Sequence, residues 1–368
     1  MKVAIVGGKL QGTEAIYLAK KAGYYSILID INENVMAAKL SDCFVCGDLI
    51  KRDENVIKAL KEADVILPAM ENMAVIKAIE EISMEYNLLV AFDFEAYMVT
   101  QSKLKSDELF KNNNIPAPIY YPNCEPPYIL KPICESGSHG VRKISDINEL
   151  KAIGEPSDYI IQEYLEGPSY SIEVIGNGRD FRTYEITEIH MDDKYDCKMV
   201  TAPLDLPYNI ENNFREIAIK IAKIIKLNGI MDVEVILNKG ELKVLEIDAR
   251  MPSQTPSVVL GCSGINLLKE LMELKLNGRF PKTGNMKKRY CVYENFSYEK
   301  GILRNEGEHI MSDAGFLKIE SSKYGYDDII WDYISGNNFR GIFINSSESK
   351  EGIIKDRNNL VGQLKELS

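Results

Sequence analysis

Residues 229–256, GIMDVEVILNKGELKVLEIDARMPSQTP, contain the pattern that decides the fold. Two strand-like runs flank the turn sequence Asn238-Lys239-Gly240, which predicts a β-hairpin. With residue 234 opposite residue 246, one face of the hairpin is apolar and the other is acidic, whereas a register shifted by one residue would scatter the acids. The apolar face is then expected to hold Val233, Val235, Leu245 and Ile247, and the acidic face Asp232, Glu234, Glu246 and Asp248.

The acidic face needs a counter-charge, because like charges that face each other across a hairpin repel. No Lys or Arg is interspersed among the four acids, and Arg250 follows in phase on the same face. Mg²⁺ takes hard oxygen ligands and completes its shell with water and substrate phosphates, while an arginine can hold a phosphate oxygen. The stretch therefore indicates a site for a nucleoside triphosphate, with a solvated acidic face as the alternative.

The composition is that of a globular enzyme with two or three domains: 368 residues, of which 45% are hydrophobic and 27% charged. The net charge of −11 and the pI of about 5.1 argue against nucleic-acid or anionic-membrane binding, since both need a basic surface. We find no apolar run of about 20 residues and no signal peptide. Seven cysteines, an odd number spread along the chain, favour a reducing cytoplasm over a disulfide framework.

Residues 1–92 alternate strand-like and helix-like segments, which predicts a Rossmann-like domain with a parallel sheet. The first strand is followed by the loop GGKLQG (residues 7–12) and by a helix from Thr13. Lys9 occupies the place of the second glycine of a dinucleotide fingerprint, so an NAD site with Asp30 at the ribose is disfavoured. Ligands still bind at this edge of such sheets. The candidate substrate contacts there are Lys9, Leu10, Gln11 and Glu71.

Residues 93–280 carry the other candidate binding segments. A helical bridge over 93–125 leads to a small α+β lid subdomain over about 126–162, in which the strand YILKP carries Lys131. The small-residue loop that follows presents backbone amides suited to phosphate at Ser136, Gly137 and Ser138, with a plain hairpin as the alternative. The catalytic antiparallel sheet over 163–280 opens with four residues suited to adenosine, Glu163, Tyr164, Leu165 and Glu166. Residues 281–368 predict a strand-rich lobe that completes this domain.

The order of these motifs resembles the ATP-grasp superfamily from the first strand to about residue 280: a βαβ domain, a bridge with Lys103, YILKP, ESGSHG, QEYLEG, MDVEV and EIDAR. The resemblance implies an α/β ATP-grasp architecture with α+β later domains, which uses ATP and two Mg²⁺ ions, with Mn²⁺ left open. Asp248 stands where the family pattern has Asn, which keeps the oxygen ligand and adds charge. The residues implied are Glu234, Glu246 and Asp248 for metal, Lys103, Lys131 and Arg250 for phosphate, and Arg250, Lys131 and Ser136 for catalysis.

Within the superfamily, GGKLQG, FDFEAY, the CES loop, YDCKMVT and IDARMPSQTP resemble the ligases that join 3-methylornithine to lysine in pyrrolysine biosynthesis. The resemblance implies a cytoplasmic, ADP-forming ligase that joins the carboxylate of (3R)-3-methyl-D-ornithine to the ε-amine of L-lysine through an acyl phosphate; a homodimer is left open. Two zwitterionic substrates need carboxylate and hydrogen-bonding partners. Further residues with that chemistry are Glu173, Asp196, Ser253, Gln254 and Thr255.

Three other functions remain as alternatives. The nearest is another ATP-grasp carboxylate–amine ligase, of purine or peptide synthesis, which would share the nucleotide site and differ in the acceptor. An NAD-dependent oxidoreductase would use the N-terminal sheet, against which Lys9 argues. A nucleotide sensor without catalysis is disfavoured by Lys131, Glu234 and Glu246.

Overall fold

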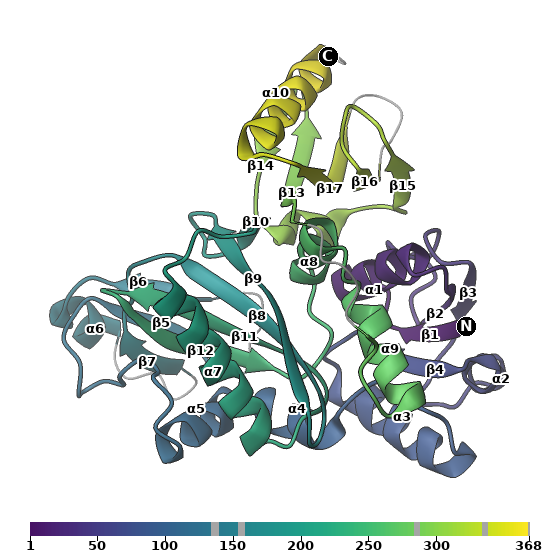
Figure 1. The fold of residues 1–368 in the computed structure, drawn as a ribbon, viewed down its shortest axis with the longest axis horizontal. Coiled ribbons are helices and arrows are strands. Elements are labelled where there is room, and N and C mark those ends of the chain that lie inside the picture. Colours follow the sequence, from purple (N-terminus) through teal and green to yellow (C-terminus); the bar gives the residue numbers. More distant parts are fainter. Residues whose placement is uncertain (134–139, 154–158, 283–287, 333–337, 367–368) are drawn as a thin grey trace.

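The computed structural model describes residues 1–133, 140–153, 159–282, 288–332 and 338–366. Figure 1 shows three groups of elements: an N-terminal sheet with its helices at the right, a small sheet at the far left, and a large sheet that runs from the left to the top. Within the described ranges, no helix is both long and apolar enough to span a membrane.

The N-terminal sheet is parallel, as predicted, with the strand order β3-β2-β1-β4. Strand β1 is buried along almost its whole length, as expected for a strand covered by helices on both faces. Helix α1 begins at Leu10 and not at the predicted Thr13, so Leu10 and Gln11 lie in its first turn. The elements are β1 (Lys2–Val6), α1 (Leu10–Lys21), β2 (Tyr25–Asp30), β3 (Cys43–Cys46), α2 (Glu54–Glu62), β4 (Val65–Pro68) and α3 (Met73–Tyr86).

The loop between β1 and α1 is held by Asp30. One oxygen of this carboxylate accepts from the Gly8 amide (2.8 Å) and the other accepts from the Asn32 amide (2.8 Å). Gly7 has φ +104°, a conformation that favours glycine. Both oxygens of the Asp30 carboxylate therefore accept hydrogen bonds from backbone amides, which agrees with the argument against a dinucleotide site.

Two helices and a small antiparallel sheet follow. The Asp93 side chain caps the first helix by accepting from the Ala96 amide (2.9 Å), and Ser102 caps the second. The small sheet has the order β6-β5-β7, with β5 in the centre. The elements are α4 (Phe94–Thr100), α5 (Lys103–Asn112), β5 (Tyr128–Pro132), β6 (Arg142–Ile144), α6 (Ile147–Ile153) and β7 (Tyr159–Glu163).

The large sheet is antiparallel and has ten strands among the described residues, in the order β12-β11-β8-β9-β10-β13-β17-β16-β15, with β14 paired to β13. Strands from the C-terminal part thus continue the sheet that holds the acidic hairpin. Its strands are β8 (Ser169–Asn177), β9 (Phe181–Met191), β10 (Cys197–Ala202), β11 (Asn228–Asn238), β12 (Glu241–Asp248), β13 (Tyr290–Glu299), β14 (Ile302–Asn305), β15 (Lys318–Ser321), β16 (Asp328–Trp331) and β17 (Phe339–Ser347). The helices are α7 (Tyr208–Ile224), α8 (Thr255–Ser263), α9 (Leu267–Asn277), α10 (Lys350–Glu366) and the 3₁₀ helix η1 (Glu308–Asp313).

The predicted hairpin is formed by β11 and β12, and Glu234 faces Glu246 as predicted. Lys239 and Gly240 have φ of 51° and 87°, as the favoured two-residue hairpin turn requires. A β-bulge then shifts the register, so that Val235 faces Val244. The prediction that Leu245 lies on the apolar face was wrong: the bulge leaves it partly exposed, in the lining of a cavity that Glu234 and Glu246 also line.

The apolar face of the hairpin packs on helix α7. Phe214 and Ile221 of the helix and Val233 and Val244 of the hairpin are fully buried in one cluster. Burial of a large aliphatic or aromatic side chain contributes about 1.5–3 kcal/mol. This packing makes the hairpin a rigid floor and leaves its acidic face for a ligand.

Candidate active site

A cavity of about 630 Å³ lies between the small sheet and the large sheet, a size typical of small-molecule sites. Its lining includes seven predicted contacts: Lys103, Lys131, Glu163, Tyr164, Leu165, Glu234 and Glu246. Glu166 is exposed and is not among the lining residues. The predicted phosphate loop at Ser136, Gly137 and Ser138 lies outside the described residues.

Two lysines lie near the acidic strand from different elements. Lys131 projects from the central strand of the small sheet, and burial lowers its pKa while the Glu246 carboxylate opposes that shift. Lys103, at the start of α5, donates from Nζ to the Pro132 carbonyl (3.4 Å). Cations beside carboxylates at one end of a cavity suit a polyphosphate that is shared with metal ions.

The other part of the cavity is lined by the strand exit at Glu163. Its carboxylate accepts from the Ile119 amide (2.9 Å) and pairs with Lys243 of β12, which ties β7 to the hairpin. The amides of Glu163 and Tyr164 donate to the Ile119 and Pro127 carbonyls. Leu165 is the next residue along the chain, and no hydrogen bond of its amide is found within the described part of the protein.

The acidic face has the properties of a cation site. Burial and the neighbouring carboxylates raise the pKa values of Glu234 and Asp248, and the same causes raise that of Asp232. One oxygen each of Asp232 and Asp248 is buried without a hydrogen-bond partner. Buried carboxylate oxygens without partners are costly, so the residues present fit divalent cations, which would neutralise them.

Arg250 connects this face to the N-terminal sheet. It forms ion pairs with Asp248 (Nε to Oδ2, 2.7 Å) and with Glu71 (2.8 Å). The Glu71 oxygen also accepts from the side-chain amide of Gln11 (3.0 Å). Through Arg250, the predicted phosphate contact, the predicted substrate residues Gln11 and Glu71 are linked to the acidic strand. Both precede Arg250 by more than 170 residues in the sequence.

A second cavity of about 150 Å³ adjoins the first, and Glu234 and Glu246 line both. The predicted substrate residues Asp196, Ser253, Gln254 and Thr255 line it, together with Asp248 and Arg250. Lys9, Leu10, Gln11, Glu71 and Glu173 are not among the residues that line either cavity. Glu173 is fully buried on β8, where it faces Asp232 on β11.

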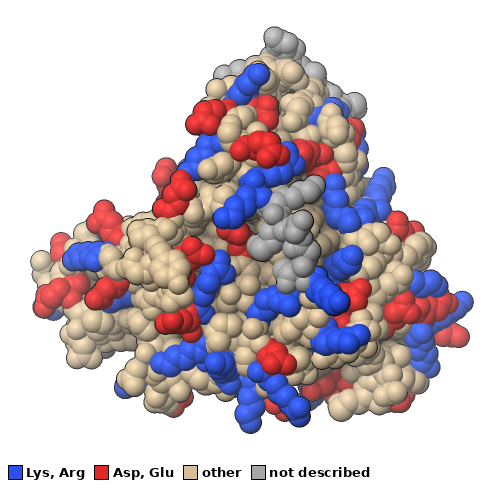
Figure 2. Space-filling view, in the orientation of Figure 1, with Lys and Arg blue, Asp and Glu red and all other residues tan. Residues whose placement is uncertain are grey.

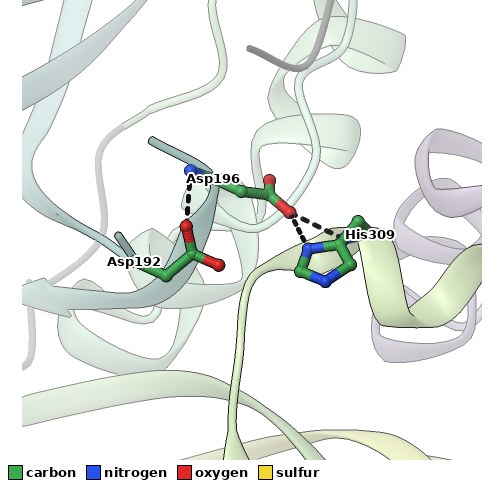
Figure 3. A group of neighbouring side chains, drawn as sticks. All are labelled: Asp192, Asp196 and His309. Atoms are coloured by element: carbon green, nitrogen blue, oxygen red, sulfur yellow. Dashed lines mark hydrogen bonds and ion pairs between the residues drawn. The ribbon is translucent and has the colours of Figure 1, made fainter. Parts of the chain in front are cut away.

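Three residues in and around the small cavity were missed by the sequence analysis. Glu308 lines it, and the Gln254 side-chain amide donates to its carboxylate. Asp192 and His309 lie on either side of Asp196, and the ligand atoms of these three residues lie within 4.8 Å of one another (Figure 3). Glu308 and His309 follow β14 in a segment without a recognisable motif, so spacing alone could not have identified them.

Acidic and basic side chains are interspersed over the face of the molecule in Figure 2.

Comparison with known proteins identifies the family. Residues 100–254 match the model of an ATP-grasp domain. The chain is 42% identical over 311 residues to the 3-methyl-D-ornithine–L-lysine ligase of Methanosarcina barkeri, which covers 84% of each chain. It is 43% identical to the enzyme of that name from Methanosarcina mazei, over 84% of this chain and 82% of the relative.

The fold agrees with solved ATP-grasp structures. N5-carboxyaminoimidazole ribonucleotide synthetase from Staphylococcus aureus, solved with ADP, superposes with a TM-score of 0.72 at 17% identity, over 97% of this chain and 96% of that one. At this identity the likeness concerns the fold alone. The identity to the sequence relatives is high enough to show the family. The chain belongs to the family of the 3-methyl-D-ornithine–L-lysine ligases, within the ATP-grasp superfamily.

Proposed function

We propose that this chain is an ATP-dependent ligase that joins the carboxylate of (3R)-3-methyl-D-ornithine to the ε-amine of L-lysine, with release of ADP, as a step of pyrrolysine biosynthesis. The 42% identity to a ligase of that name over 84% of both chains carries the proposal. The joined cavities support it, because the larger is of a size for a nucleotide and the smaller for the reacting groups of amino acids.

The chemistry explains why the reaction needs ATP. A carboxylate does not condense with an amine in water, because the oxygen would have to leave as hydroxide. Phosphorylation of the carboxylate gives an acyl phosphate, from which an amine displaces phosphate through a tetrahedral oxyanion. Two Mg²⁺ ions held by Glu234, Glu246 and Asp248, with Mn²⁺ as a substitute, would neutralise charge on the transferring phosphoryl group.

The chain's own residues position the reactants. We assign Lys103 and Lys131 to the phosphates, since both lie at the acidic end of the larger cavity. Leu165 is assigned to the adenine edge through its backbone amide, and Glu166 to the ribose. The loop at Ser136, Gly137 and Ser138 is assigned to the phosphates from the resemblance alone. Holding these groups in a reactive geometry supplies much of the rate enhancement.

Arg250 is assigned to the oxygen atoms of the transferred phosphate. Its ion pairs with Asp248 and Glu71 hold the guanidinium in the lining of the smaller cavity. Ser253, Gln254 and Thr255 follow on the same segment and are assigned to the amino acid substrates. Of the remaining predicted contacts, Gln11 and Glu71 act through Arg250, while Lys9, Leu10 and Glu173 remain proposals without a cavity contact.

We also place the enzyme in the cytoplasm. The cysteines in the described part of the chain are all unpaired, which suits a reducing compartment.

One coupled assay tests the function. Purified protein is mixed with ATP, Mg²⁺, lysine and D-ornithine, a simpler analogue of methylornithine, and both ADP and the product mass are measured. We expect ADP release that requires both amino acids, with a product lighter than their sum by one water. ADP release without a joined product would refute the ligase, and release with unrelated amino acid pairs would point to another ATP-grasp ligase.

A further inference from the structure

A short C-terminal segment, Gly307–His309, closes one wall of the small cavity. The Gly307 amide donates to Asp192 Oδ2 (3.2 Å), and the His309 amide donates to Asp196 Oδ2 (2.9 Å). The His309 ring nitrogen Nδ1 lies 2.5 Å from the same Asp196 oxygen, as Figure 3 shows. A side chain at Gly307 would collide with the Asp196 carboxylate, so the absence of a side chain lets the backbone at Gly307 pack directly against Asp196.

This anchoring places Glu308 in the cavity lining. The residues on both sides of it are fixed to the loop between β9 and β10, while its own carboxylate accepts from the neutral side-chain amide of Gln254. Gln254 has φ +73°, a strained backbone conformation that non-glycine residues seldom adopt. A strained residue that holds a partly buried carboxylate at a cavity is typical of a functional site.

The charges around the small cavity indicate a cationic ligand. Its lining contains six carboxylates and one guanidinium. Three of the carboxylates, on Glu234, Glu246 and Asp248, are assigned to metal, and Asp248 also pairs with Arg250. Asp196 already accepts hydrogen bonds from the backbone amide and the ring of His309. Asp232 and Glu308 remain, and no salt bridge within the described ranges neutralises either of them.

Of these two, Glu308 is the better placed to meet an incoming amine. Asp232 belongs to the floor of the site, on β11, where it lies between Glu173 of β8 and Asp248 of β12. Glu308 comes from η1, outside the hairpin, and lines the small cavity together with Arg250 and Glu246, where the phosphate end of the nucleotide is assigned. An amine at Glu308 therefore lies beside the position of the acyl phosphate.

We propose that Glu308 binds the ε-ammonium of the acceptor lysine and takes its proton, so that the free amine can attack the acyl phosphate. This inference rests on the proposed function and identifies the base for its second step. An ammonium ion has no lone pair, and attack therefore requires that a proton leave first. The carboxylate supplies both an ion-pair partner and the proton acceptor.

The proposed step removes two protons from the nitrogen, forms the carbon–nitrogen bond and breaks the bond from the acyl carbon to the phosphate oxygen. The Glu308 carboxylate accepts one proton from the ε-ammonium, and the nitrogen lone pair forms a bond to the acyl carbon. The bond between that carbon and the phosphate oxygen breaks, and its electron pair leaves with the phosphate. The nitrogen then loses a second proton, which the departing phosphate accepts, to give the neutral amide.

The surroundings of Glu308 favour this role. Burial, with repulsion from Asp196 as a further cause, raises the pKa of Glu308 to about 7. A carboxylate with a raised pKa is a stronger base than an ordinary one and is still ionised in part at neutral pH. The titratable groups that face it are Asp196, Glu71, Glu234, Arg250, Cys197 and Tyr293.

A trapping experiment separates this step from the phosphorylation step. Wild type and Glu308→Gln are each given ATP, Mg²⁺ and D-ornithine with either lysine or hydroxylamine as the acceptor. Hydroxylamine is largely uncharged at neutral pH, so it captures an acyl phosphate as the hydroxamate without a base. We expect Glu308→Gln to form hydroxamate at nearly the wild-type rate and to lose lysine ligation about 100-fold.

The pH dependence gives a second measure, which a purely structural role would not change. Without the base, the variant depends on lysine that is already deprotonated in solution, and that fraction grows about tenfold per pH unit below the lysine pKa of about 10.4. Its ligation rate should therefore rise about tenfold per unit from pH 7 to pH 9. The wild-type rate should rise much less over this range.

Glu306→Gln is the matched control, because Glu306 immediately precedes this segment and its carboxylate accepts a hydrogen bond from the Ser297 hydroxyl instead of lining the cavity. It should ligate lysine like the wild type. Normal lysine ligation by Glu308→Gln would overturn the inference alone, and so would an equal loss of both reactions. A wild-type enzyme that forms neither product would overturn the proposed function and the inference with it.

Discussion

Glu173→Gln should remove a pH-dependent loss of stability from the protein. Glu173 is 0% exposed on β8, where it faces Asp232 on the neighbouring strand β11. Burial raises the pKa of its carboxyl from 4.5 to about 7, and the Thr255 hydroxyl opposes this only in part. Glutamine keeps the shape of a protonated glutamate and has no proton to lose, so the substitution tests the charge alone.

The size of the effect follows from the two pKa values. Between pH 4.5 and pH 7 the unfolded chain loses the Glu173 proton while the folded chain retains it, so the free energy of unfolding falls as the pH rises. Each pKa unit is worth 1.36 kcal/mol. The difference of 2.5 pKa units therefore lowers the free energy of unfolding by about 3 kcal/mol. Most of this decrease occurs above pH 5, and it is complete by about pH 8.

Chemical denaturation at pH 5, 6, 7 and 8 measures this effect. Trp331 is the only tryptophan of the chain and is fully buried on β16, in the same sheet as Glu173, so its fluorescence reports the unfolding of that sheet. The unfolding free energy of Glu173→Gln relative to wild type should increase by about 2–3 kcal/mol from pH 5 to pH 8. Any fixed cost of the new amide group is the same at every pH and cancels.

A relative stability that stays constant between pH 5 and pH 8 would refute the reasoning. Glu241→Gln, at an exposed position of β12 in the same sheet, is the control. If Glu241→Gln shows the same pH trend in stability, the removal of any glutamate from this sheet produces the trend, and the burial of Glu173 is not its cause.

Three further predictions concern the active site. Glu246→Gln should abolish turnover and leave the melting temperature nearly unchanged, since it removes a proposed metal ligand from an exposed position; an active variant would disprove the metal assignment. Lys131→Met should weaken binding of a non-hydrolysable ATP analogue at least tenfold by calorimetry, because a charged hydrogen bond is worth about 1.5–3 kcal/mol; unchanged affinity would remove Lys131 from the nucleotide site. Gly307→Ala should lower stability by about 1–3 kcal/mol and raise KM for lysine, because the new methyl group displaces Asp196; normal values for both would show that the wall tolerates the change.

Much of the site was predictable because its determinants are local. The alternation of valine and acid along residues 232–248 predicted the hairpin, its acidic face and the pairing of Glu234 with Glu246. The strand-and-helix alternation of the first 92 residues predicted the parallel sheet. In both cases the side-chain period of a strand or helix is written directly in the order of residues.

The first turn of α1 shows where local patterns are less informative. Glycines at positions 7, 8 and 12 suggested a loop up to Thr13, yet the helix begins at Leu10. Gly12 lies where a side chain would meet the Gly7 carbonyl, so this glycine serves close packing inside the helix. Composition alone does not distinguish a glycine required by packing from one required by a turn.

The acidic hairpin, the lysine of the small sheet and the family could all be predicted from the sequence, since each depends on neighbouring residues or short motifs. Which distant groups meet at that hairpin became clear only from the packing of the folded chain. The bulge that turns Leu245 toward the cavity, the ion pair between Arg250 and Glu71, and the entry of Glu308 from the C-terminal strands are its results. The physical reason is that such contacts depend on how separate elements pack, and residues 71, 250 and 308 share no periodic relation in the chain.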